Sequence, residues 1–159
     1  MNIDIINALL ENVTPLKSDC GRLCDAACCK DDEGAGVWLL PGEGAQCPWG
    51  TVSDSIMPVT QTPVKLLMCA APCERSKRPF MCRIFPLTPY FSKKKNRWDV
   101  RMDVRAAALC PLYGYGIKAL DPEFTQNVRT AVGLLAADEE GIRLLERLEA
   151  EEKAYRIEL

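Results

Sequence analysis

Four cysteines fall within ten residues of this chain, in the segment Cys20-Gly-Arg-Leu-Cys24-Asp-Ala-Ala-Cys28-Cys29. A buried free cysteine packs as a small hydrophobic side chain and gains nothing from having other cysteines beside it. Thiolates in a tight group repel one another and oxidise readily, and a metal ion removes both problems because it shares the charge of several sulfurs. The cluster therefore predicts metal ligands.

The spacing of this cluster limits how it can bind a metal. In a helix, Cys20, Cys24 and Cys28 would form one stripe, because residues four apart are neighbours on a helix face. Cys20 and Cys28 would then be separated by about 12 Å of helix rise, which is too far for one zinc ion with Zn–S bonds of about 2.3 Å. Either the segment is a loop wrapped around one centre, or the stripe serves more than one metal.

Composition narrows the chemistry further. The chain has nine cysteines and no histidine, so a zinc site would use thiolates, and a histidine-based catalytic dyad or triad is excluded. Thiolate ligands favour zinc or an iron–sulfur cluster over magnesium or calcium, which prefer oxygen. Disulfides are not expected, because the predicted location is the cytoplasm, and because a bond between the adjacent Cys28 and Cys29 would be strained.

Charge and hydropathy argue against two classes of partner. The net charge is −2, so the chain as a whole offers no electrostatic attraction for nucleic acid or for a membrane surface. No apolar run approaches the roughly 20 residues that a membrane-spanning helix needs. Residues 1–13 carry acidic side chains and lack the basic start of a signal peptide. We therefore predict a cytoplasmic protein that binds neither nucleic acid nor membrane.

A second cysteine-containing string is more specific. Residues 78–86 read Arg-Pro-Phe-Met-Cys-Arg-Ile-Phe-Pro, and Cys110-Pro111 follows later. Together with Cys20 to Cys29, this order resembles the CxxCxxCC family of zinc- or iron-chelating proteins over about residues 20–111. Three residues separate the first thiols here, where the family has two. The resemblance implies metal binding and no established reaction, and either Cys47 or Cys69 corresponds to the family's fifth cysteine.

The predicted ligands are eight of the nine cysteines, with Cys47 as the spare one. They are Cys20, Cys24, Cys28, Cys29, Cys69, Cys73, Cys82 and Cys110. Three functions fit this set: a protein that binds zinc or iron, an iron–sulfur protein with a redox or cluster-dependent enzymatic role, and a zinc-stabilised protein-interaction module. No catalytic residue and no substrate are predicted.

Three charged residues near the cysteines have two interpretations each. Arg78 and Arg83 either lower the pKa of neighbouring thiolates and offset their charge, or form ordinary surface ion pairs. Glu43 is either a carboxylate near the metal or a solvated surface residue, and the second is the expected one.

The fold class predicted is α+β. Residues 1–159 form a single domain, in which a cysteine-rich metal-binding core spans residues 14–116 and a helical region spans residues 121–158. Much of residues 30–80 is expected to be irregular and held by metal bonds, including a long loop at 41–63.

Regular structure is expected at both ends of the chain and in one hairpin. Apolar residues three or four apart predict a helix over residues 2–12, and an Asp-Pro-Glu start at residue 121 predicts a helix followed by a second one that runs to about residue 157. Alternating apolar residues predict a hairpin over 85–104 with a basic tip at 93–97. The C-terminal helices or this tip could bind a protein partner or a second copy of the chain.

Overall fold

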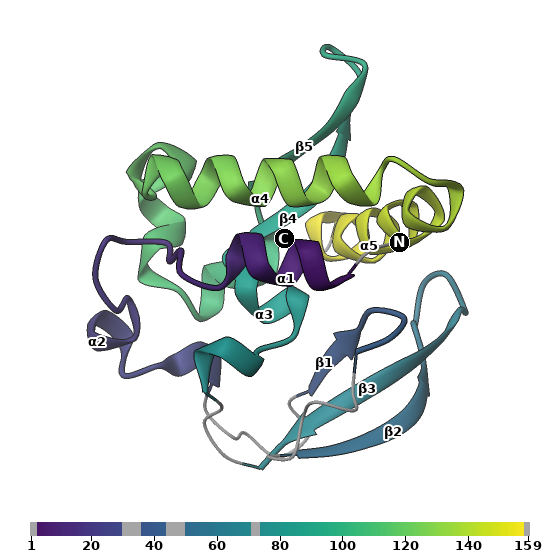
Figure 1. Cartoon of the computed structure of the whole chain (residues 1–159), viewed down its shortest axis with the longest axis horizontal. Coiled ribbons are helices and arrows are strands. Elements are labelled where there is room, and N and C mark those ends of the chain that lie inside the picture. The colour runs from purple at the N-terminus through teal and green to yellow at the C-terminus, as the bar shows by residue number, and fades with distance from the viewer. Residues whose placement is uncertain (1–2, 30–35, 44–49, 71–73, 158–159) are drawn as a thin grey trace.

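The helices α1 (Ile3–Leu10), α4 (Pro122–Leu135) and α5 (Glu139–Ile157) pack around a β-hairpin in the upper part of Figure 1. This computed structural model describes residues 3–29, 36–43, 50–70 and 74–157. Helix α4 contacts both α1 and strand β5 (Arg97–Met102), and α5 contacts strand β4 (Leu87–Ser92). The α+β class is confirmed, with one main core formed by the three helices and the hairpin.

The helices form where local signals predict them. In α1, Ile6 and Leu10 are buried one turn apart, as the apolar spacing predicts. The Asp121 carboxylate accepts a hydrogen bond from the Glu123 N–H at 2.8 Å, which satisfies a free donor at the start of α4. The backbone is tightly packed where α4 ends and α5 begins. A Cβ atom at Gly141 would lie 1.7 Å from the Leu135 carbonyl oxygen. Glycine is required at that position.

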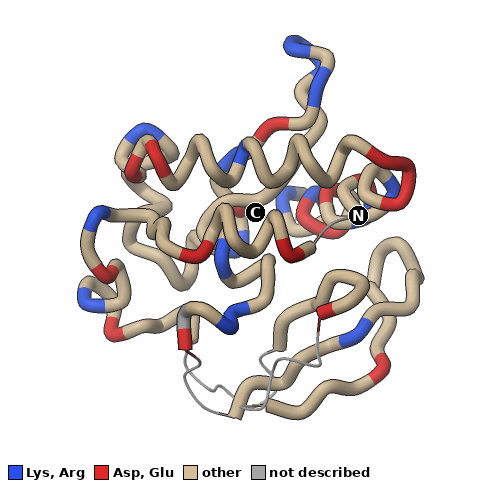
Figure 2. The backbone as a smooth tube through the Cα atoms, viewed as in Figure 1, with Lys and Arg blue, Asp and Glu red and all other residues tan. Residues whose placement is uncertain are grey.

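The β4–β5 hairpin is confirmed as predicted. The strands are antiparallel, with Leu87 opposite Met102 and Ser92 opposite Arg97. Residues 93–96 form the exposed turn, where Asn96 adopts a left-handed conformation with φ 48°. Figure 2 shows the basic tip at the end of the hairpin, where it projects beyond the helices.

A three-stranded antiparallel sheet lies below the helices and corrects the prediction for the middle of the chain. Strand β3 (Pro63–Cys69) lies between β1 (Gly36–Leu39) and β2 (Gly50–Ile56). The predicted loop at 41–63 therefore contains a strand, and residues 30–80 are less irregular than expected. β2 was missed because it is an edge strand with mostly polar and exposed residues, so it lacks the apolar alternation of a half-buried strand.

A buried glutamate joins this sheet to the helices. Glu151 of α5 is fully buried and accepts hydrogen bonds from the N–H groups of Val59, at 3.0 Å, and Thr60, at 2.8 Å. Both donors lie between β2 and β3, so the carboxylate clamps that connection against α5. The sheet also contacts α3 (Phe80–Ile84) through β1.

Short helical segments make up most of the remaining described chain. They are α2 (Gly21–Cys24), η1 (Ala27–Cys29), η2 (Arg75–Lys77), η3 (Val104–Ala108), η4 (Pro111–Tyr115) and η5 (Ile117–Ala119). Among the helices that the structure describes, none is long and apolar enough to cross a bilayer.

Candidate functional site: a cavity lined by cysteines

The first cysteine cluster is a wrapped loop and not a continuous helix. Helix α2 has only one turn, after which Asp25 and Ala26 both adopt left-handed conformations with φ 51°. Such a conformation costs roughly 1–2 kcal/mol for a residue other than glycine, and it reverses the chain direction before η1. The Asp19 carboxylate accepts a hydrogen bond from the Gly21 N–H at 3.0 Å and holds the start of the loop. The helical stripe is therefore wrong and the segment is a loop, while its wrapping around one metal centre stays a prediction.

Five thiols from three separate parts of the chain line one small cavity. Its volume is about 40 Å³, which is room for something the size of a water molecule or a metal ion. The wrapped loop supplies three of the cysteines, α3 supplies one, and the residue before η4 supplies one. These are Cys20, Cys24, Cys28, Cys82 and Cys110.

A sixth thiol lies beside this cavity. Cys29 lines a larger adjoining cavity together with Cys28 and Cys82. The sulfur atoms of Cys28 and Cys29 are 3.9 Å apart, so they are not joined by a disulfide. Two ligands of a tetrahedral metal site with bonds of about 2.3 Å are separated by about 3.8 Å, so this spacing fits a shared ion.

The thiols line the cavity, but they are not arranged as the ligands of a metal site. Within the parts of the chain that the structure describes, no three or more cysteine or carboxylate side chains lie close enough together to hold a metal ion. Any such site therefore needs thiols to turn toward a common centre. The cavity lining fits zinc or iron, because the lining side chains that can ligate a metal are thiols.

The protonation of the adjacent pair is asymmetric. The pKa of Cys29 is lowered to about 6, chiefly by its hydrogen bond with Cys28 and in part by the positive charge of Arg78. The pKa of Cys28 is raised, chiefly by the same hydrogen bond and also by partial burial. Burial also raises the pKa of Cys110. The hydrogen bond and the charge of Arg78 both favour the thiolate form of Cys29.

Both arginines of the Arg78–Pro86 string line the thiol cavity. Arg83 is buried, and its guanidinium donates hydrogen bonds to the carbonyl oxygens of Arg78, Ser76 and Asn7 at 2.5, 2.7 and 3.3 Å. It thereby ties the string to α1. The charge of Arg78 lowers the pKa of Cys29, which favours the electrostatic interpretation of this residue.

Glu43 is not the solvated surface residue that was expected. Its half-buried carboxylate accepts hydrogen bonds from the N–H groups of Leu40, at 2.9 Å, and Phe80, at 2.8 Å. Burial raises the pKa of Glu43, and these two bonds oppose that shift. Because Phe80 is the first residue of α3, Glu43 positions the helix that carries Cys82.

The other predicted ligands are placed differently. Cys69 ends β3 opposite Gly50 and packs against the small core of Leu39 and Leu67. It is not among the described residues that line either cysteine cavity. Cys73 and the spare Cys47 lie outside the residues that the structure describes.

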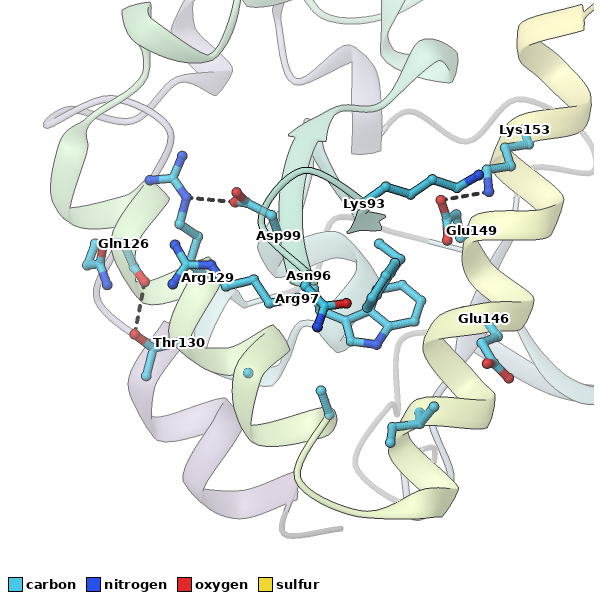
Figure 3. A pocket seen from close by; sticks show the side chains of 15 residues that line it. Lys93, Asn96, Arg97, Asp99, Gln126, Arg129, Thr130, Glu146, Glu149 and Lys153 are labelled. Atoms are coloured by element: carbon cyan, nitrogen blue, oxygen red, sulfur yellow. Dashed lines mark hydrogen bonds and ion pairs between the residues drawn. The ribbon is translucent and has the colours of Figure 1, made fainter.

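A third cavity, of about 890 Å³, lies between the hairpin and helices α4 and α5 (Figure 3). Its described lining contains no cysteine, and several of its charges are paired: Arg129 with Asp99 at 3.0 Å, and Lys153 with Glu149 at 2.8 Å. Lys93 of the hairpin tip also lines it. Binding of a protein partner or a second copy at this surface stays a prediction.

Sequence reasoning missed three residues of the larger cysteine cavity. Trp38, Arg105 and Tyr155 come from β1, η3 and α5, and all three line it. No local spacing connects them, because they are far apart in the chain.

No protein-family model, curated protein or solved structure matches this chain, so the resemblance to the CxxCxxCC family stays a prediction.

Proposed function

We propose that this protein binds a thiophilic metal ion, zinc or iron, through cysteine thiolates of the wrapped loop, α3 and η4. The observation that carries the proposal is that Cys20, Cys24, Cys28, Cys82 and Cys110 line one cavity although they span 90 residues of sequence. A core that needed only small apolar side chains would have no reason to collect thiols from three segments.

The residues around the cavity would suit such an ion. Six thiols, those of the cavity and of Cys29, are available as ligands, and Cys73 remains a predicted ligand outside the described residues. Arg78 places a positive charge beside thiolates that would otherwise repel one another. A site closed by four thiolates would stabilise the fold, whereas catalysis by the metal requires an open coordination position.

The direct experiment is elemental analysis together with an absorption spectrum of protein purified without oxygen. Stoichiometric zinc in a colourless protein would indicate a zinc site, and iron with a broad visible band would indicate an iron–sulfur cluster. Protein that contains neither metal, and takes up neither when reduced and supplied with it, would contradict the proposal.

Substitution of single cysteines locates the site. Cys82→Ser should lose most of the bound metal, because Cys82 lines both cysteine cavities. The matched control is Cys69→Ser, which should retain the metal, because Cys69 packs on the sheet beside Leu39 and Leu67. The measurement is metal content per folded chain. Retention by Cys82→Ser with loss by Cys69→Ser would place the site elsewhere.

A further inference from the structure

The larger cysteine cavity has the size and lining of a small-molecule site. Its volume is about 390 Å³, within the range of roughly 300–1,000 Å³ that ligand pockets occupy. It shares Cys28, Cys82 and Arg78 with the thiol cavity, so the two are direct neighbours. A molecule bound in the larger cavity would therefore lie against thiols of the proposed metal site.

Most of this cavity is apolar. Its walls come from β1, β3, α3, β4 and the segment after η3. The apolar residues are Val37, Trp38, Leu66, Met81, Phe85, Leu87 and Leu109. A lining of this kind binds the hydrocarbon or aromatic part of a ligand, and a few polar groups orient it.

Arg105 is the polar group best placed to orient a ligand. Its guanidinium is fixed by Asp103, with Nε to Oδ1 at 2.9 Å and Nη2 to Oδ2 at 2.6 Å. It also lies near the rings of Trp38, at 5.9 Å, and Tyr155, at 5.8 Å, within the range of a cation–π contact. The side chain is 27% exposed, so it is held rigidly at the cavity wall and still reached by solvent.

This guanidinium retains unused donors. A guanidinium has five N–H donors, and the bonds to Asp103 occupy the Nε–H and one N–H of Nη2. No other residue that the structure describes accepts a hydrogen bond from Arg105. The remaining donors suit the oxygens of a carboxylate. A guanidinium can donate two parallel hydrogen bonds to a carboxylate, whereas a lysine ammonium acts as a point charge.

We propose that the larger cavity binds a small organic carboxylate with an aromatic or aliphatic body, its anion at Arg105 and its body among the apolar walls. The cavity and its arginine exist whether or not the thiols bind metal. That the bound acid is a ligand or substrate of the thiol centre rests on the proposed function.

The test is isothermal titration calorimetry of the full chain with 4-phenylbutanoate, octanoate and the uncharged 4-phenylbutanamide. 4-Phenylbutanoate should bind tenfold or more tightly than 4-phenylbutanamide, because the amide has the same body without the anion. Equal affinity for acid and amide, or no binding of either acid at millimolar concentration, would overturn the proposal. Metal content is measured on the same sample, so a failure of metal binding is seen separately.

Two variants assign the binding to this cavity. Arg105→Lys keeps the positive charge and removes the planar pair of N–H donors, so it should weaken binding of the acid about tenfold. Tyr155→Leu is the second variant, because Tyr155 is 41% exposed and its replacement leaves the core intact; it should weaken binding several-fold. The control is Arg97→Lys on the hairpin tip, which should bind as the unchanged protein does. If neither Arg105→Lys nor Tyr155→Leu weakens binding, the site is elsewhere and the proposal is wrong.

Discussion

Asp99 shows how a single buried carboxylate can remain ionised in this fold. It is 3% exposed, and burial alone would raise its pKa. Hydrogen bonds from Lys95, the Val100 N–H and Arg129 outweigh burial and lower the pKa of Asp99 to about 2. Figure 3 shows the contact between Arg129 and Asp99. The residue therefore links the hairpin to α4 through charge.

The lowered pKa predicts a pH-dependent stability. Since the folded-state value lies below the ordinary 3.8, the ionised carboxylate stabilises the fold above about pH 4, and this contribution is lost as the pH falls toward 2. The difference corresponds to about 2 kcal/mol. Asp99→Asn should therefore lose about 2 kcal/mol at pH 7 in urea unfolding, and its stability should fall less between pH 4 and pH 2.

The control for this prediction is Asp54→Asn. Asp54 pairs with Lys65 on the surface and its side chain is 89% exposed, so we expect a change below about 0.5 kcal/mol. An unchanged pH dependence in Asp99→Asn would contradict the role given to Asp99.

At the scale of elements, one buried side chain of α5 holds the connection between β2 and β3. Glu151 accepts from two backbone N–H groups and from the Thr60 hydroxyl at 3.0 Å, all in the connection between β2 and β3. In that connection Met57 is buried, whereas Pro58, Val59 and Gln61 are exposed. The carboxylate thus fixes the far end of the sheet to the helices.

Glu151→Ala should release this connection. Hydrogen bonds to a charged acceptor contribute about 1.5–3 kcal/mol, so we expect a loss of about 2–3 kcal/mol in the free energy of unfolding. Amide hydrogen exchange at Val59 and Thr60 should accelerate most. Glu146→Ala, an exposed change on the same helix, serves as the control and should alter neither quantity. Unchanged exchange at Val59 and Thr60 would show that other contacts hold the connection.

The elements that sequence predicts here are those specified by nearby residues. The Asp121 cap, the apolar spacing of α1 and the alternation of β5 are local signals, and each was confirmed. Glu151 looks like a residue on the polar face of a helix, yet it is fully buried, because its partners are 91 and 92 residues away. β2 was missed for a related reason: its pairing with β3, and not its own sequence, makes it a strand.

At the scale of the whole molecule, the thiol cavity lies where segments of separate origin meet. The clustering of Cys20 to Cys29 and the string around Cys82 were visible in the sequence, and the cavity brings most of them together. The cysteine spacing could not decide between helix and loop, because that depends on two left-handed residues, Asp25 and Ala26. Nor could it reveal Arg105, whose neighbours come from a strand and from the last helix.

The same arrangement predicts what removal of a bound metal would do. The wrapped loop has no buried residue in α2 or η1, whereas α4 buries six residues, five of them in the main core. Chelation should therefore loosen residues 18–29 and leave α4 and α5 folded. Hydrogen exchange measured by mass spectrometry should accelerate in peptides from residues 18–29, while the helical circular dichroism signal stays nearly constant.

The Cys82→Ser variant, which should already lack metal, is the control and should not respond to the chelator. Exchange that accelerates equally in α4, or not at all in residues 18–29, would mean that metal does not hold the wrapped loop in place.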